Sequence, residues 1–351
     1  MAELDDGILA WSEFERSLRE RWPDPGPGAS FTERRDHARR IADTLAGATA
    51  DVPSPGCRIT EVPVDADAPA GTARAPFARI YTPVENDGPL PTQLFLHGGG
   101  FCFGSARELV NDSVLTARTV ATGIQHVSLE YALAPEHRFP VARDQTLRVF
   151  AELHERAEEL SIDTSRLGLG GNSAGASIVA SAALVLQRRP VDAGPRPHHL
   201  FLEVPAVSLQ ALGTALTDPA ARDEPADRPA ISPETEQQFP SEYHSVLELY
   251  RPARDGSAFV ADAADLPPFP PALILAAEHD PLAGGAVLLA ERLRRGGNAV
   301  RSQTVPGTFH GAPGITRTSP AAQEWQRIVD EELRIAYRTH PSVPVPDTPG
   351  V

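Results

Sequence analysis

The chain has 351 residues, enough for one large domain with attached segments, and its 41% hydrophobic content is sufficient to bury a substantial core. Its 32 basic and 47 acidic residues give a net charge of −15, which argues against nucleic acid as a partner because phosphate backbones repel an acidic protein. The sequence contains no lysine, which excludes a lysine Schiff base and the phosphate-binding lysine of a P-loop.

Neither a membrane span nor a secretory leader is expected. No apolar run approaches the roughly 20 residues that a spanning helix needs, and the acidic start at residues 2–6 lacks the basic region of a signal peptide. We therefore expect a cytoplasmic protein. The two cysteines, Cys57 and Cys102, are too few for a disulfide scaffold or a cysteine-rich zinc site, so we expect free thiols.

The N-terminal segment 1–57 is predicted to be helical. Apolar side chains recur at three- and four-residue steps between residues 11 and 22, as on one face of an amphipathic helix. Ser30 and Glu33 form a capping-box pattern that opens a second helix toward Leu45. These helices form either a surface hairpin or part of a lid over an active site, and the pattern does not choose between them.

A catalytic domain is predicted over residues 58–338, where short β-rich runs alternate with helical segments. This alternation indicates an α/β fold with a mostly parallel sheet covered on both faces, and ligands of such sheets bind at the carboxyl ends of the strands. The first strand contains Pro63 and is therefore expected at a sheet edge. Strands are predicted at 59–64, 78–81, 94–96, 126–131, 166–169, 199–204, 272–276 and 299–305, and helices at 106–121, 145–160, 174–186, 284–295 and 320–338.

Two segments break the alternation. Residues 205–262 are predicted to be an insertion, which is polar and proline-rich over 213–240 and is either a lid or a disordered loop. Apolar residues return at Tyr243 and Tyr250, which favours the lid. Residues 339–351 hold four prolines and no periodic apolar face, so we expect a mobile tail.

A candidate nucleophile lies at residues 171–175, which read Gly-Asn-Ser-Ala-Gly. The Gly-x-Ser-x-Gly pattern between a strand and a helix is typical of a sharp turn that exposes the serine hydroxyl, here Ser173. The preceding run 166–169 fits a strand, and small residues after Ala174 fit a helix that packs tightly on a sheet. A glycine-rich turn without chemistry remains the alternative.

A second glycine motif follows the strand predicted at 94–96, where His97 precedes three consecutive glycines. Three glycines free the backbone to direct amide N–H groups toward the oxyanion of an acyl-transfer intermediate, together with the amide of Ala174. A phosphate-binding loop is the alternative interpretation, but no lysine is present to complete it.

A base and an orienting acid are expected after the serine in the chain. His310 follows a predicted strand and the turn at 306–308, and Asp280 follows the strand predicted at 272–276. Glu278 and Asp265 are weaker candidates for the acid, and His279 is expected to be a neighbour rather than the base. A metal site at the adjacent histidines 198 and 199 is disfavoured because neighbouring strand residues point to opposite faces.

Taken together, these motifs resemble the hormone-sensitive-lipase-like carboxylesterases of the alpha/beta-hydrolase superfamily, over about residues 78–337. The motifs that carry the resemblance are Tyr81-Thr82-Pro83, His97 to Gly100, Tyr131 to Pro140, Gly171 to Gly175, Asp280-Pro281-Leu282 and Phe309-His310-Gly311. The resemblance implies a sheet of about eight strands, a helical lid, and hydrolysis without a metal or cofactor.

The same resemblance implies a role for each site residue. Ser173 would be the nucleophile, His310 the base and Asp280 its orienting acid. The amides of Gly99, Gly100 and Ala174 would form the oxyanion hole.

Several positions depart from the family pattern. Asn172 stands where an aspartate is usual, and Gly284 and Gly285 replace an Asp-Glu pair beyond Asp280. Without that pair, the Asp280 loop is expected to be held by other contacts or to be looser. These departures leave the family's usual substrates uncertain for this chain.

The function expected is hydrolysis of a carboxylic ester of a small molecule, with a short acyl chain. Phe101, Cys102 and Phe103 directly follow the glycines, so one or two of their side chains either line the acyl pocket or pack against the sheet. An amidase or deacetylase acting on an acylated metabolite is the alternative within enzymes. A small-ligand receptor on a hydrolase scaffold is the alternative of another class. A homodimer is a further expectation.

Overall fold

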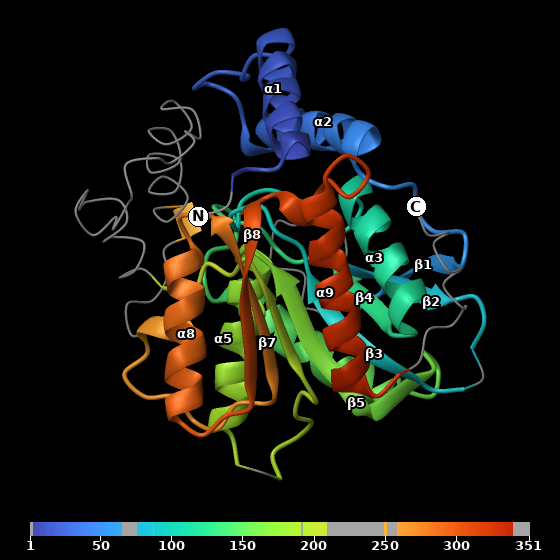
Figure 1. Cartoon of the computed structure of the whole chain (residues 1–351). Coiled ribbons are helices and arrows are strands. Elements are labelled where there is room, and N and C mark those ends of the chain that lie inside the picture. Colours follow the sequence, from blue (N-terminus) through green and yellow to red (C-terminus); the bar gives the residue numbers. More distant parts are fainter. Residues whose placement is uncertain are drawn as a thin grey trace.

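The computed structural model of the chain describes residues 3–64, 76–86, 88–190, 192–208, 249–250 and 258–339. A central sheet of eight strands runs through this part of the chain, with helices on both of its faces (Figure 1). The strands are β1 Cys57–Pro63, β2 Phe77–Pro83, β3 Leu90–Leu96, β4 Gln125–Leu129, β5 Ile162–Asn172, β6 Leu200–Glu203, β7 Ala272–His279 and β8 Val300–Phe309. Their order across the sheet is β1-β2-β4-β3-β5-β6-β7-β8.

The sheet is mostly parallel, as the alternation of strands and helices predicted. β1 pairs with β2 and β2 pairs with β4 in antiparallel register, whereas every other neighbouring pair is parallel. Pro63 lies in the edge strand β1, which confirms its expected position. The parallel strands therefore end at one common edge, where a site can be assembled.

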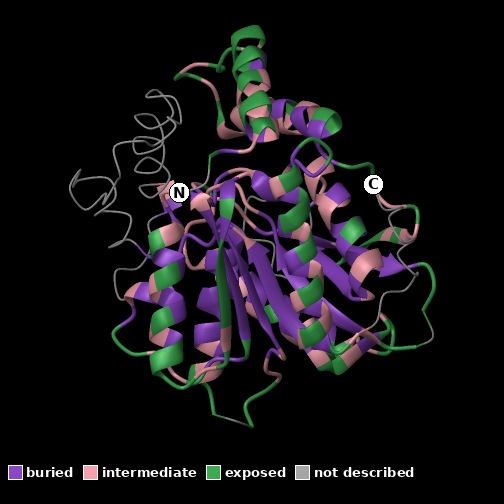
Figure 2. Cartoon of the chain, in the orientation of Figure 1, coloured by how far each residue is buried: buried purple, intermediate pink, exposed green. Residues whose placement is uncertain are grey.

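The central strands are buried, whereas the edge strands β1 and β8 are partly exposed (Figure 2). Side chains of a central strand alternate between the two faces of the sheet. In β3, Leu94 and Leu96 belong to one hydrophobic cluster, whereas Phe95 belongs to the cluster on the other face. This is why residues 94–96 of the strand are an apolar run rather than an alternation of polar and apolar residues.

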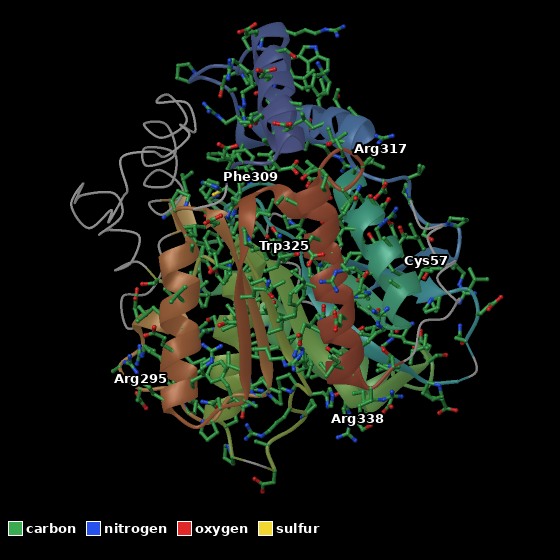
Figure 3. All side chains as sticks on the ribbon, in the orientation of Figure 1. Cys57, Arg295, Phe309, Arg317, Trp325 and Arg338 are labelled. Atoms are coloured by element: carbon green, nitrogen blue, oxygen red, sulfur yellow. The ribbon has the colours of Figure 1, made fainter. Side chains whose placement is uncertain are left out.

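Helices complete the two layers. The helices α4 Val141–Glu155, α5 Ala174–Arg188 and α8 Ala283–Arg295 contribute buried side chains to the first cluster. The helices α3 Leu109–Thr122 and α9 Pro320–Tyr337 contribute to the second, where Trp325 of α9 is fully buried (Figure 3). The helix predicted at 145–160 lies earlier in the chain, because α4 begins at Val141, directly after Pro140, and ends at Glu155.

The N-terminal segment forms the helices α1 Asp6–Arg21 and α2 Phe31–Thr49, which lie beyond the end of the sheet where β8 ends (Figure 1). The capping box is confirmed, because Ser30 Oγ accepts the Glu33 N–H and the Glu33 carboxylate accepts the Ser30 N–H. The ring of Trp11 in α1 lies 5.0 Å from that of Phe309 at the end of β8. The helical segment thus contacts the carboxyl edge of the sheet.

Most of the expected insertion at 205–262 and all but the first residue of the expected tail at 339–351 lie outside the described residues. Of the insertion, residues 205–208, 249–250 and 258–262 are described, including a short 3-10 helix at Val260–Asp262. Among the helices that are described, none combines the length and the apolar character needed to cross a membrane.

Candidate active site

Ser173 occupies a sharp turn between β5 and α5. Its backbone has φ 52° and ψ −117°, a conformation that is strained for a residue with a side chain. A Cβ at Gly171 would lie 2.5 Å from the carbonyl carbon of Gly175, and a Cβ at Gly175 would lie 2.1 Å from the carbonyl oxygen of Leu96. Only glycine fits at both positions, so the glycines of the motif permit the turn and its close packing on β3.

Three predicted residues meet at the carboxyl edge of the sheet. Nε2 of His310 lies 2.7 Å from Oγ of Ser173, and Nδ1 of His310 lies 2.8 Å from Oδ2 of Asp280. His310 directly follows β8 and Asp280 directly follows β7, so both lie at strand ends as predicted. The turn predicted at 306–308 is instead part of β8, which continues to Phe309. The hydroxyl therefore has a base within hydrogen-bonding distance, and that base has an orienting carboxylate.

Asp280 also organises its own loop. Its Oδ1 accepts the N–H of Leu282 at 2.9 Å, its carbonyl oxygen accepts the N–H of Ala283 at 3.0 Å, and its side chain is fully buried. A Cβ at Gly285 would lie 3.2 Å from the Cβ of Ser208, so the start of α8 packs closely against the segment after β6. These contacts hold the loop without the acidic pair that the family pattern usually has there.

The charge of Asp280 changes the acid–base behaviour of His310. Burial disfavours the imidazolium and lowers the pKa of His310, but the negative charge of Asp280 and the hydrogen bond to it outweigh burial. The net effect is a pKa above the ordinary value of 6.5. Such a shift strengthens the imidazole as a proton acceptor near neutral pH.

The other candidates lie elsewhere. Glu278 accepts the N–H of Gly307 at 2.9 Å, and the side chain of Asp265 is 85% exposed, whereas Asp280 is the carboxylate within hydrogen-bonding distance of His310. His198 contacts the carbonyl oxygen of Ala336 at 3.0 Å through Nε2. Within the described ranges, no group of three or more His, Cys, Asp or Glu side chains is arranged to hold a metal ion.

The glycine loop after β3 lies against the serine turn. Gly99 has φ 122° and Gly100 has φ 57°, in the region that favours glycine, and a Cβ at Gly99 would lie 2.2 Å from the carbonyl oxygen of Phe103. A Cβ at Gly98 would lie 3.3 Å from the Cβ of Ser173. In the described part of the chain, the amides of Gly99, Gly100 and Ala174 donate no hydrogen bond.

Interactions from two sides fix this loop. The ring of His97 stacks on Tyr131 with centroids 4.3 Å apart, and the Tyr131 hydroxyl donates to the His97 carbonyl oxygen at 2.8 Å. From α2, the guanidinium of Arg35 donates to the carbonyl oxygens of Cys102 and Ala134, both at 2.8 Å. The same guanidinium pairs with Glu136 at 2.6 Å, so α2 is tied to the loop that carries the candidate oxyanion donors.

The three residues after the glycines differ in accessibility. Phe101 is 2% exposed and its ring stacks on Tyr250 with centroids 3.9 Å apart, and Cys102 has no exposed surface. Phe103 is half-buried, and its ring lies 6.5 Å from that of Phe31 in α2. Of the three, Phe103 is therefore the residue with side-chain surface left to contact a ligand.

Two buried charged residues next to Ser173 were not predicted. Glu203 at the end of β6 and Arg118 in α3 are each 1% exposed and form an ion pair with an N–O distance of 2.5 Å. Glu203 follows three apolar residues of a buried strand, and a charged residue in such a strand is the one signal by which the sequence marks it.

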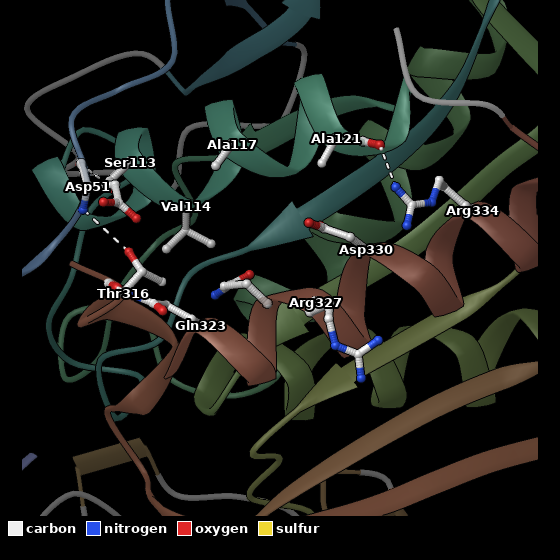
Figure 4. Close-up of a pocket in the computed structure, with 11 residues that line it drawn as sticks. Asp51, Ser113, Val114, Ala117, Ala121, Thr316, Gln323, Arg327, Asp330 and Arg334 are labelled. Atoms are coloured by element: carbon white, nitrogen blue, oxygen red, sulfur yellow. Dashed lines mark hydrogen bonds between the residues drawn. The ribbon is translucent and has the colours of Figure 1, made fainter. Parts of the chain in front are cut away.

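A separate hollow of about 330 Å³ lies between α3 and α9 and contains none of the residues described above as the serine site (Figure 4). Oδ1 of Asp330 in this hollow is buried and has no hydrogen-bond partner among the described residues. Burial raises the pKa of Asp330 to about 7, against the opposing effect of Arg118 and Arg334. The hollow is thus a feature of the helical layer, distinct from the edge where the strands end.

Comparison with known proteins agrees with this architecture. Residues 93–313 match a family model described as alpha/beta hydrolase fold. The chain belongs to this alpha/beta-hydrolase family, and its predicted membership of the hormone-sensitive-lipase-like carboxylesterases is confirmed. The predicted fold, a mostly parallel eight-stranded sheet flanked by helices, is confirmed as well.

Individual relatives are esterases. The chain is 32% identical to carboxylesterase NlhH of Mycobacterium tuberculosis over 270 residues, which are 77% of this chain and 80% of the relative. It is 31% identical to ethyl acetate hydrolase of Pseudomonas putida over 262 residues, 73% of this chain and 77% of the relative. A solved structure of ester-hydrolase EH1AB1 from the metagenome of Lake Arreo, complexed with a bipyridine phosphonate derivative, superposes with a TM-score of 0.73 at 25% identity, covering 96% of this chain and 98% of that one.

Proposed function

We propose that the chain hydrolyses a carboxylic ester of a small molecule through a covalent acyl-enzyme formed on Ser173. The observation that carries the proposal is the pair of hydrogen bonds that joins Ser173, His310 and Asp280, with distances of 2.7 and 2.8 Å. The relatives named carboxylesterase and ethyl acetate hydrolase support an ester as the substrate.

In the first half of the reaction, Ser173 Oγ attacks the ester carbonyl carbon while His310 Nε2 takes the hydroxyl proton. The tetrahedral intermediate collapses by breaking the bond to the alcohol oxygen, which leaves with the proton from His310. A water molecule then attacks the acyl carbon and gives a proton to His310. The acid leaves, and the proton returns to Ser173. Asp280 fixes the tautomer of His310 throughout.

We assign the backbone N–H groups of Gly99, Gly100 and Ala174 as the donors that stabilise the negative charge on the carbonyl oxygen. Support comes from the position of their loop, whose Gly98 lies against Ser173, and from the lack of an acceptor for these amides within the described residues. Donors already in place cost no reorganisation when the charge develops, and each is worth about 10²- to 10³-fold in turnover.

We assign one wall of a short acyl pocket to Phe103, with Phe101 and Cys102 forming its buried support. Phe103 lies three residues after Gly100 and retains accessible surface, whereas the other two are almost fully buried. A series of p-nitrophenyl esters is expected to peak between acetyl and hexanoyl. A peak at twelve carbons or beyond would contradict this assignment.

The N-terminal segment is proposed to cover part of the same site. Its support is the contact of Trp11 with Phe309 and the bonds of Arg35 to the carbonyl oxygens of Cys102 and Ala134. The expected homodimer remains a prediction, which light scattering of the purified chain can check.

The proposed function is tested by comparing Ser173→Ala and His310→Ala with the wild type on p-nitrophenyl acetate and on the matching acetanilide. Both variants are expected to lose at least about 10³-fold in kcat while their circular dichroism is unchanged. Activity retained within tenfold in either variant would contradict the serine mechanism. A wild type that cleaves the anilide but not the ester would make the chain an amidase, and a wild type that binds both without cleavage would favour a receptor.

A further inference from the structure

A buried ion pair lies directly behind the serine turn. Arg118 from α3 donates to both carboxylate oxygens of Glu203, at 2.5 Å from Nη2 and 3.3 Å from Nη1. The indole N–H of Trp325 in α9 donates to the same carboxylate at 2.7 Å. Hydrogen-bond donors thus surround this carboxylate, so the cluster suits a charged glutamate whose charge Arg118 balances.

Glu203 is connected to the serine turn in two ways, once through its backbone and once through its carboxylate. The backbone N–H of Ser173 donates to the carbonyl oxygen of Glu203 at 2.8 Å. Asn172 Nδ2, one residue before the serine, donates to Glu203 Oε2 at 3.2 Å. A residue with a strained backbone keeps its conformation only when its surroundings fix it, and these two bonds act on the strained residue and on its neighbour.

Asn172 also contacts the glycine loop. A Cβ at Gly98 would lie 2.7 Å from Asn172 Oδ1, so the amide group of Asn172 fills the space between Glu203 and the loop. One end of this amide binds the carboxylate, and the other end lies against the backbone of Gly98. The side chain therefore bridges the buried ion pair and the loop that carries the candidate oxyanion donors.

We propose that Glu203 is a positioning residue that holds Ser173 and, through Asn172, the glycine loop in the geometry needed for acyl transfer. The proposal rests on the proposed serine mechanism. Arg118 pairs with the carboxylate and holds it in place, and Asn172 donates a further hydrogen bond to it. Neither Glu203 nor Asn172 touches the reacting atoms, so both act through the residues they hold.

The pairing of an amide with a carboxylate is specific. An ionised aspartate has no donor, so Asn172→Asp would replace a hydrogen bond by two carboxylate oxygens about 3 Å apart in a buried site. The cluster of Arg118, Glu203 and residue 172 is neutral in the wild type and would carry one negative charge in this variant. Glu203→Gln would leave one positive charge. The double variant would again be neutral, with the amide introduced at position 203 donating to the new carboxylate at position 172.

These charge balances define the experiment on p-nitrophenyl acetate. Asn172→Asp is expected to lower kcat at least tenfold, which corresponds to about 1.4 kcal/mol, while KM changes less than threefold. Glu203→Gln is expected to lower kcat as well. The double variant is expected to exceed both single variants in kcat by at least fivefold, because the hydrogen bond and the charge balance return together.

The pH dependence of kcat distinguishes a displaced active site from a loss of folded protein. In Asn172→Asp, protonation of one carboxylate restores a donor between the two side chains, so the deficit in kcat relative to wild type is expected to narrow as the pH falls. A matched control is Asp112→Asn. Asp112 lies on α3, as Arg118 does, and the substitution breaks its ion pair with Arg79 of β2. The control is expected to lower the thermal midpoint without changing kcat.

The outcomes are distinct. The proposal is overturned if folded Asn172→Asp keeps kcat within twofold of wild type, or if the double variant is no better than the worse single variant. Should Asn172→Asp fail to fold, Asn172→Ala removes the bridge without added charge and must still lower kcat at least fivefold in folded protein. Failure of the proposed function would appear instead as activity retained in Ser173→Ala.

Discussion

Replacing Asp280 by asparagine tests the acid–base chemistry of the site. Both carboxylate oxygens are in use, Oδ2 facing His310 Nδ1 at 2.8 Å and Oδ1 accepting the Leu282 N–H at 2.9 Å, and the side chain has no exposed surface. An asparagine has one oxygen for these two donors. If it serves Leu282, its NH₂ group faces Nδ1, and His310 must carry its proton on Nε2, where it cannot accept the proton of Ser173.

The opposite amide orientation would direct the NH₂ group against the Leu282 N–H and leave a buried donor unsatisfied, at a cost of about 1–3 kcal/mol. The inactive tautomer is therefore favoured. We expect Asp280→Asn to lower kcat by about 10⁴, which corresponds to about 5 kcal/mol in transition-state stabilisation.

The same variant is expected to shift the pH dependence. In the wild type, His310 must be neutral to accept a proton, so kcat/KM is expected to fall as the pH drops through a pKa above 6.5. Without the charge of Asp280, burial alone acts on His310 and lowers its pKa, so the residual activity should fall at a lower pH. A matched control is Glu278→Gln, which changes a neighbouring carboxylate bonded to Gly307. It is expected to leave unchanged the pH at which kcat/KM falls on the acid side of the profile. The reasoning would be refuted if Asp280→Asn lost less than tenfold in kcat, or if its kcat/KM fell at the same acidic pH as that of the wild type.

Three further substitutions test separate features. Gly99→Ala is expected to lower kcat by about 10²- to 10³-fold, because its Cβ would meet the Phe103 carbonyl oxygen at 2.2 Å and displace an oxyanion donor; ester assays check this, and unchanged turnover would remove the glycine from the oxyanion hole. Asp330→Asn is expected to raise the thermal midpoint at pH 8 by roughly 2–4 °C for each kcal/mol gained, because a carboxyl with its pKa raised to about 7 destabilises the fold when ionised; the gain should vanish near pH 4, and calorimetry showing no such dependence would contradict it. Gly285→Glu is expected to lower the thermal midpoint because its Cβ would lie 3.2 Å from Ser208, and a midpoint equal to wild type would show that this contact can relax.

Much of the fold and the positions of the site residues could be predicted because their signals are local. The alternation of strands and helices depends on short windows of sequence, and it located the strand ends that carry Ser173, Asp280 and His310. The glycines around the serine were informative because a Cβ would not fit there, as the 2.1 Å approach at Gly175 illustrates. Because a side chain is sterically excluded at these positions, the glycines could be recognised from the sequence alone.

The support of the site could not be predicted because it depends on contacts between distant segments. Glu203 is separated by 85 positions from Arg118 and by 122 from Trp325, and only the order of the strands in the sheet brings the three together. The sequence marked Asn172 as a departure from the family pattern, but its bond to Glu203 at 3.2 Å gives the departure a physical meaning.

The central claim is that Ser173 is the nucleophile, and labelling with a fluorophosphonate probe followed by peptide mass spectrometry tests it most directly. The probe needs both an activated serine and an oxyanion hole, so it reports on the two parts of the site together. We predict a single adduct on Ser173 in the wild type and none in His310→Ala under the same conditions. An adduct on another residue, or equal labelling of Ser173 in both proteins, would contradict the account.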